Sequence, residues 1–491
     1  MHDRDLAAVI ALLEQLKPAL DRRDRAKLND IIGKLIARNA PVGAQWQPLA
    51  QIALHNGELS LARAAINLYV ASRAGDPAAD YEKATLLSQA GDWQGAYDMI
   101  RTLAPAGRNA AAVAFSRGTA ALNLGMVDEA RAQLEHVTQL VPHSGSAWGA
   151  LAATVNFARE RDLADRLIAA ASLFRNAAPK ESAAYHYALG KTHADRAEHA
   201  QAFAAFAQGA RLLKSIRPYS RNDDVAEAQE AVRGYSAGNI AALARQQRAP
   251  TARTIFVTGL PRSGTTLVQQ ILTSHSDVSA GAEIGRLALL AADMGGASFP
   301  ALSRYVGAQG MAPAARLWDH WMDERFPGSG LGGLRVVDKT CDNSRQLGLA
   351  AALLPDAPLI WMTRDPLDRA WSCFRHHFFE GMPWSNDLAD IAAHFRLEDQ
   401  LLLQWQQLLG DRLLVVPYEA LVTDAQAWTR RILAHCGLAE QQAPFAPHEN
   451  RGLTATASVQ QVRRPINREG IGAAEPYRAF LGAFVEAYEA R

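Results

Sequence analysis

The sequence has few cysteines, no excess of either charge and no long apolar run. Its three cysteines, Cys341, Cys373 and Cys436, are far apart, which suits a reducing compartment better than a disulfide framework or a cysteine metal site. The net charge of +1 argues against a nucleic-acid-binding protein with a wholly basic surface. Because no run of about 18 uncharged apolar residues occurs, we expect no transmembrane segment.

The first residues also lack the features of a secretory signal. Met1–Leu6 contains no basic stretch followed by an uninterrupted apolar one. Together these absences predict a cytoplasmic protein. Since 491 residues exceed one ordinary hydrophobic core, we expect two or three domains.

Residues 1–215 are rich in alanine and leucine and are expected to form one helix after another. An alanine recurs there every 34 residues, at Ala62, Ala96, Ala130 and Ala164, and a fifth copy with Ala202 follows after a longer gap. This period resembles the tetratricopeptide repeat, whose helix pairs stack into a solenoid with a groove. Either the groove holds a partner or a protein substrate, or the array only stabilises or dimerises the protein.

Residues 216–253 are a polar connector. Helical periodicity from Val225 to Gln247 indicates a bridging helix, and residues 248–253 mark a domain boundary. The next domain is expected over residues 254–491.

That domain opens with a strand, a tight loop and a helix over residues 254–272. The loop runs from Gly259 to Gly264, as in nucleotide triphosphatases. Thr265, however, stands where those enzymes have lysine, and the cation is Arg262, inside the loop. The loop therefore suits an anion other than a metal-bound triphosphate.

Apolar runs separated by helices predict a mostly parallel sheet covered on both faces. Three further strands are expected at residues 333–339, 357–364 and 412–418. Ligands of such sheets bind at the carboxyl ends of the strands. Four functional side chains follow the strands there: Arg262, Lys339, Arg364 and Tyr418.

The segment Pro261–Leu267, with Arg364 eight residues before Ser372, resembles the sulfotransferase family that uses 3′-phosphoadenosine 5′-phosphosulfate (PAPS). The resemblance covers about residues 254–470. It is strongest to bacterial proteins that join tetratricopeptide repeats to a domain similar to tyrosylprotein sulfotransferase. It implies an α/β sulfotransferase domain, related to the phosphate-loop folds, that follows the helical solenoid.

The resemblance also implies a donor site that needs no metal. The loop residues that would contact the 5′-phosphosulfate are Arg262, Ser263, Gly264, Thr265 and Thr266. Arg364 and Ser372 would bind the 3′-phosphate through charge-assisted hydrogen bonds. Tyr418 would assist donor binding, and a late loop with Ser458 and Arg464 would close over the nucleotide.

For catalysis, the resemblance implies that Glu283 is the general base that takes the acceptor's hydroxyl proton. The alternative is that Glu283 only caps the next helix. Lys339 would stabilise charge on the departing phosphate. Arg262, in the loop around the phosphosulfate, is also expected to be catalytic. Arg286 is similar to an arginine that contacts the acceptor.

The adjacent pair His376–His377 is expected to pack rather than to bind metal, because neighbouring helical residues diverge and no third ligand is evident.

The leading hypothesis is sulfuryl transfer to a hydroxyl, with tyrosine of a peptide or protein as the first choice of acceptor. Carbohydrates, lipids and small phenols are alternative acceptors. A P-loop kinase or nucleotidase is disfavoured by Thr265 and by the Arg364–Ser372 pair. A non-catalytic repeat scaffold is the remaining alternative.

Overall fold

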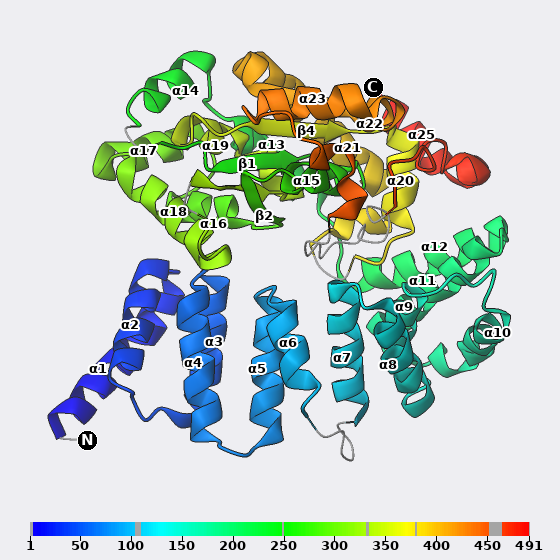
Figure 1. Ribbon diagram of the computed structural model, residues 1–491, viewed down its shortest axis with the longest axis horizontal. Coiled ribbons are helices and arrows are strands. Elements are labelled where there is room, and N and C mark those ends of the chain that lie inside the picture. The colour runs from blue at the N-terminus through cyan, green and yellow to red at the C-terminus, as the bar shows by residue number, and fades with distance from the viewer. Residues whose placement is uncertain are drawn as a thin grey trace.

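The computed structural model describes residues 3–103, 110–247, 250–329, 333–378, 381–450 and 464–490. Figure 1 shows two parts: a row of helices from the first half of the chain, and an α/β part built around a sheet. None of the helices in these ranges is long and apolar enough to cross a membrane.

The first half is helical, as the sequence predicts. Its helices are α1 (Asp3–Asp21), α2 (Arg25–Ala37), α3 (Trp46–His55), α4 (Leu59–Ser72), α5 (Pro77–Gln89), α6 (Trp93–Ile100), α7 (Ala110–Leu124), α8 (Val127–Leu140), α9 (Gly145–Ala152), α10 (Arg161–Ala169), α11 (Pro179–Asp195) and α12 (His199–Ile216). Short 3-10 turns lie at Gly43–Gln45 and Ala170–Phe174.

The recurring alanines lie at equivalent places in successive helix pairs. Ala62, Ala96, Ala130, Ala164 and Ala202 belong to α4, α6, α8, α10 and α12, and each is at most 1% exposed. A methyl side chain at these positions lets two helices approach closely. The contacts between helices therefore repeat with the 34-residue period of the sequence. Each helix pair buries the apolar face of the next pair.

The connector forms two helices rather than one bridging helix: α13 (Arg221–Val232) and α14 (Ala237–Ala244). The chain turns between them at Gly234, whose φ is +78°. Ser236 then begins α14 with a reciprocal capping box to Asn239. The turn residues therefore override the helical periodicity read across this segment.

The second half contains a five-stranded parallel sheet in the order β2-β3-β1-β4-β5, which confirms the predicted parallel arrangement. The strands are β1 (Thr254–Thr258), β2 (Val278–Ala282), β3 (Arg335–Asp338), β4 (Leu359–Thr363) and β5 (Leu413–Pro417). Residues 278–282 form the edge strand β2, which is not among the strands expected from the sequence, and Arg286 begins a helix.

Helices pack around this sheet (Figure 1). They are α15 (Thr265–Thr273), α16 (Arg286–Asp293), α17 (Phe299–Gln309), α18 (Ala312–Arg325), α19 (Leu347–Leu353), α20 (Pro366–Phe374), α21 (Leu388–Leu409), α22 (Tyr418–Thr423), α23 (Ala425–His435) and α25 (Gly482–Glu489). The central strand β1 is buried along its whole length, so both faces of the sheet are covered.

The row of helices α1–α12, called the array below, contacts the α/β part near its N-terminal end. Arg25 forms an ion pair with Asp293 at 2.6 Å, and Glu58 contacts the ring of His320 at 2.7 Å. The guanidinium of Arg25 also lies over the ring of Trp321, 4.8 Å from its centroid. These contacts join α2 and the turn before α4 to α16 and α18.

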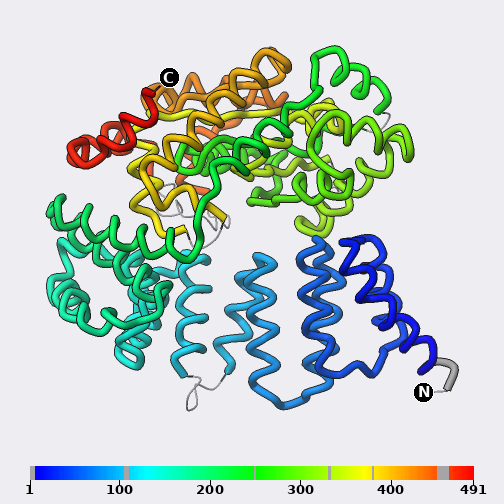
Figure 2. Tube along the Cα trace, turned by 180° about the vertical axis from the view of Figure 1, so that it is seen from behind, coloured from blue at the N-terminus to red at the C-terminus, as the bar shows by residue number. Residues whose placement is uncertain are grey.

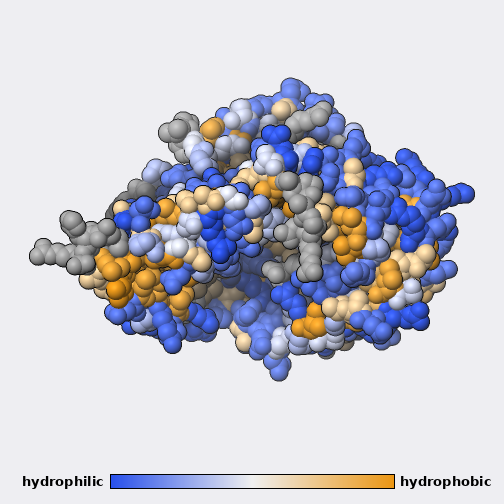
Figure 3. Space-filling view, turned by 90° about the horizontal axis from the view of Figure 1, so that it is seen from below, coloured by the Kyte–Doolittle hydropathy of each residue, from blue (hydrophilic) through white to orange (hydrophobic). Residues whose placement is uncertain are grey.

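The array contacts the α/β part a second time through its last helix pair. Phe203 of α12 stacks on Phe374 and Phe480, with centroid distances of 5.6 and 5.0 Å. Lys214 bridges Asp387 and Asp390 at 2.9 Å each. Figures 1 and 2 show the array passing beneath the sheet domain between these two contacts, and Figure 3 shows a mostly hydrophilic underside that is hollowed near its centre.

Candidate active site

The loop between β1 and α15 owes its shape to two glycines. At Gly259, with φ +124°, a Cβ would lie 2.4 Å from the carbonyl oxygen of Met362. At Gly264, with φ +97°, a Cβ would lie 2.7 Å from the ring of Tyr418. Arg262 also has a positive φ, +67°. The loop therefore turns tightly and delivers the chain into α15, whose N-terminal N–H groups favour an anion.

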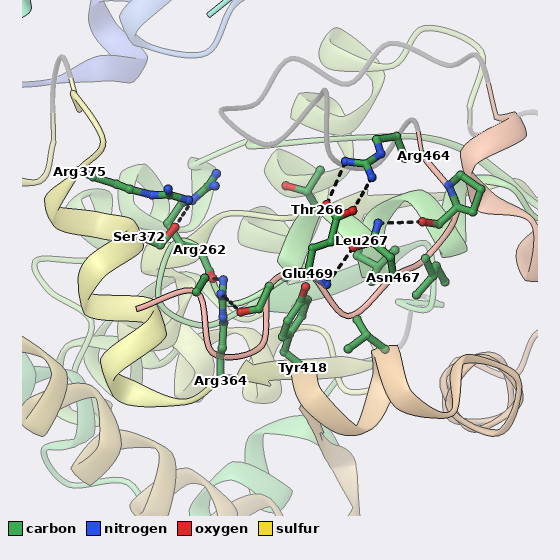
Figure 4. Close-up of a pocket in the computed structure, with 16 residues that line it drawn as sticks. Arg262, Thr266, Leu267, Arg364, Ser372, Arg375, Tyr418, Arg464, Asn467 and Glu469 are labelled. Atoms are coloured by element: carbon green, nitrogen blue, oxygen red, sulfur yellow. Dashed lines mark hydrogen bonds and ion pairs between the residues drawn. The ribbon is translucent and has the colours of Figure 1, made fainter. Parts of the chain in front are cut away.

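Three arginines, Arg262, Arg364 and Arg375, lie in or beside this loop. Arg262 donates from Nε to Ser372 Oγ at 2.9 Å. Arg364 donates to the carbonyl oxygens of Arg262, at 2.9 Å, and Gly470, at 2.5 Å. Figure 4 shows Arg375 reaching from the end of α20 toward Arg262 and Ser372. These side chains line a cavity of about 280 Å³.

Arg364 and Arg375 both bring positive charge to this cavity. No ion pair joins Arg364 or Arg375 to an acid within the described ranges. Burial, followed by the like charge of Arg375, lowers the pKa of Arg262 to about 10, and burial lowers that of Arg375. A bound anion would relieve both effects, so the arrangement favours phosphate- or sulfate-bearing ligands.

Tyr418 and Arg464 complete the walls of this cavity. Arg364 lies over the Tyr418 ring, 4.8 Å from its centroid, which fixes the plane of the guanidinium. Arg464 is an exposed residue at the rim and pairs with Glu469 at 2.6 Å (Figure 4).

Glu283 and Lys339 lie together at the carboxyl ends of β2 and β3. Lys339 is 2% exposed, and its Nζ donates to Glu283 Oε1. The Glu283 side chain is 56% exposed, so its other face is open to a ligand. The Lys339 N–H also donates to the carbonyl oxygen of Ala282, at 2.8 Å, which ties the two strand ends together.

The segment after Glu283 is anchored by Asp338 and Thr340. Thr340 Oγ1 accepts from the N–H groups of Ile284, at 3.0 Å, and Gly285, at 2.9 Å, and donates to Asp338 Oδ1 at 2.6 Å. The other oxygen of Asp338 accepts from the Asn343 amide at 2.9 Å. Burial raises the pKa of Asp338, while these hydrogen bonds oppose the rise. The backbone that follows Glu283 is thus held by a buried polar network.

The residues predicted from the sequence are divided between two cavities. Seven line the first cavity: Arg262, Gly264, Thr266, Arg364, Ser372, Tyr418 and Arg464. Glu283 and Arg286 line a second cavity of about 590 Å³. The helix α15 contributes to both, through Thr266 to the first and Gln269 to the second.

Three predicted residues line neither cavity. Ser263 is fully buried and donates to the carbonyl oxygen of Leu260 at 2.6 Å, so its hydroxyl supports the loop from within. Thr265 is 4% exposed. Lys339 does not line the second cavity itself, but it donates to Glu283, which does. Ser458 lies outside the described residues.

Arg375 is a residue of the first cavity that the sequence did not single out. It follows Ser372 by three residues, about one helical turn, and this spacing from a predicted phosphate-binding serine is a signal that could have found it.

His376 and His377 follow the end of α20 instead of lying on a helix. The His376 ring packs against Phe378 at 4.7 Å, and the His377 ring stacks on Tyr187 at 5.1 Å. Burial lowers the pKa of both histidines. In the described part of the chain, no three His, Cys, Asp or Glu residues are grouped so as to hold a metal ion.

Comparison with known proteins gives a family match within this region. Residues 254–442 match the model of the Sulfotransferase family. A protein of Aquifex aeolicus (strain VF5), described as uncharacterized, is 25% identical over 326 residues, which are 63% of this chain. The chain spans only about two fifths, 42%, of that relative's length.

Two solved structures are also similar. One is the sulfotransferase domain from the Synechococcus PCC 7002 olefin synthase, with 19% identity, a TM-score of 0.36, and coverage of 50% of this chain and 98% of that one. The other is a sulfotransferase from Mycobacterium tuberculosis H37Rv, with 15% identity, a TM-score of 0.28, and coverage of 68% and 96%. Over residues 254–442, the match to the family model supports the sulfotransferase family.

Proposed function

We propose that the protein transfers a sulfuryl group from PAPS to an acceptor hydroxyl. The observation that carries this proposal is the placement of two kinds of chemistry on either side of α15. The loop between β1 and α15 forms part of the wall of an arginine-lined cavity. The Glu283–Lys339 pair lies beside a second, larger cavity. A donor and an acceptor would therefore lie on different sides of α15.

The first cavity suits the two anionic ends of PAPS. The loop residues Gly264 and Thr266 and the N-terminus of α15 would bind the 5′-phosphosulfate with Arg262. The pair Arg364 and Ser372 would bind the 3′-phosphate, with Arg375 adding a third guanidinium. Tyr418 and Arg464 would contact the rest of the nucleotide.

The residues present account for the bonds and the proton of the transfer. The acceptor oxygen forms a bond to sulfur while the bond from sulfur to the phosphate oxygen breaks. Glu283 takes the acceptor's proton as the new bond forms. Lys339 stabilises the negative charge that develops on the departing 3′-phosphoadenosine 5′-phosphate. Because Lys339 donates to Glu283, the base and the leaving-group cation are already adjacent.

The acceptor that we favour is a tyrosine of a peptide or protein. The helix pairs, which we propose to be tetratricopeptide repeats, lie next to the second cavity and would present a polypeptide to Glu283. A carbohydrate, a lipid or a small phenol would use the same base and donor.

The donor is tested by calorimetric titration of the purified protein with 3′-phosphoadenosine 5′-phosphate and, separately, with ATP plus Mg²⁺. We expect tight binding of the first and weak or no binding of the second. Preference for ATP with Mg²⁺ would overturn the proposal in favour of a kinase or nucleotidase. Binding of neither would favour the non-catalytic scaffold.

A further inference from the structure

The second cavity is built by both halves of the chain. The α/β part contributes the edge strand β2, through residues 279–282, with Glu283, Arg286 and Arg325. The array contributes the end of α5 and the turn that follows it, residues 88–91, together with Trp93 of α6. The cavity that holds the proposed base is therefore incomplete without the array.

Two arginines of the α/β part, Arg286 and Arg325, lie against equivalent turns of two successive helix pairs of the array. Gly57 and Gly91 are 34 residues apart and have φ values of +87° and +76°. A Cβ at Gly57 would lie 2.9 Å from Nε of Arg286, and a Cβ at Gly91 would lie 2.6 Å from Nη2 of Arg325. Since any side chain would displace the guanidinium groups, the glycines make the space in which the arginines lie.

Neither arginine has an ion-pair partner in the part of the chain that the structure describes. The nearby acids are already engaged: Glu58 by Arg25 and His320, and Asp92 by Arg63 at 3.0 Å.

Glu283 is the acidic residue among the described residues that line the cavity, and it already accepts a hydrogen bond from Lys339. Burial lowers the pKa of both Arg286 and Arg325, as expected of desolvated cations without a close counter-ion. The cavity thus contains two positive charges that no described acid in its lining neutralises.

We propose that Arg325 and Arg286 bind an anionic group, a carboxylate or a phosphate, that the acceptor carries near its hydroxyl, and that the array is one wall of this acceptor site. This inference rests on the proposed function. It adds the chemical class of the acceptor and gives the repeats a direct part in recognition, through the turn at Gly91.

The test is transfer of ³⁵S from labelled PAPS into cell extract at saturating donor. One portion of extract is treated with a carbodiimide and an amine, which neutralises carboxylates, and another with phosphatase. A third is treated with the amine alone. We expect one of the first two treatments, but not the amine alone, to abolish labelling, and the effective one identifies the anion. Labelling that survives both treatments would overturn the inference.

Arg325→Met tests the residue, and Arg316→Met is its matched control, because Arg316 is an exposed residue of the same helix α18 outside the cavity. Removing one partner of a desolvated charge pair weakens binding by about thirtyfold or more, so we expect at least this loss of labelling with Arg325→Met. Arg316→Met should match the wild type. Both variants should bind 3′-phosphoadenosine 5′-phosphate normally, which shows that they fold.

Equal labelling by the two variants would contradict a role for Arg325. Absence of labelling by the wild-type protein itself is a different outcome, because it would overturn the proposed function and the inference with it.

Discussion

Thr340→Val perturbs the position of the proposed base without touching the base itself. Valine has the shape of threonine but lacks Oγ1, which forms three hydrogen bonds, with the N–H groups of Ile284 and Gly285 and with Asp338. At about 1 kcal/mol net for each bond, the loss approaches 3 kcal/mol. Because Thr340 is only partly buried, water replaces some of it, and about 2 kcal/mol remains.

If this free energy holds Glu283 in its reactive position, turnover should fall about thirtyfold. Affinity for 3′-phosphoadenosine 5′-phosphate should not change, since Thr340 does not line the first cavity. Thr340→Ser keeps the hydroxyl and is the control. The assay is ³⁵S transfer at saturating PAPS, with calorimetry for the nucleotide. Equal turnover of the valine and serine variants would refute the view that this network positions the base.

Three further predictions concern the donor site, the loop and pH. Arg364→Ala and Arg375→Ala should each weaken binding of 3′-phosphoadenosine 5′-phosphate about thirtyfold by calorimetry, and much less that of adenosine 5′-phosphate, which lacks the 3′-phosphate. Gly259→Ala should destabilise the fold by about 3 kcal/mol in urea unfolding, because its Cβ would lie 2.4 Å from a carbonyl oxygen of β4. His376 has a folded-state pKa of about 3 against an ordinary 6.5, so its neutral ring favours the fold above pH 6.5 and this contribution is lost as pH falls toward 3. His376→Asn should therefore lower the pH of acid unfolding followed by circular dichroism.

Much of the fold was predictable because its signals are local. The alanines at 34-residue intervals are small where helices touch, and β1 is an apolar run because both faces of the central strand are covered. The edge strand β2 gave no such signal. Ser279 and Gly281 interrupt it, and only Val278 is buried, since an edge strand has one neighbour and little apolar cover.

The candidate site was predictable only where it follows from the sheet. Lys339 and Arg364 come directly after β3 and β4, the parallel strands on either side of β1, so the topology alone places them at one edge of the sheet. Arg325 follows from no local pattern. Its place in the second cavity depends on the docking of α18 against the turn at Gly91, a contact between residues more than two hundred positions apart.

The measurement that tests the central claim most directly compares Glu283→Gln with the wild-type protein in ³⁵S transfer from labelled PAPS. Glutamine keeps the size of the side chain but cannot take the acceptor's proton, and loss of a general base costs about 10² to 10⁴ in rate. Glu440→Gln, at an exposed acid that pairs with Arg430 on the surface, is the matched control. We expect transfer by the wild type and by Glu440→Gln, and loss of transfer by Glu283→Gln with unchanged affinity for 3′-phosphoadenosine 5′-phosphate. Undiminished transfer by Glu283→Gln would contradict it.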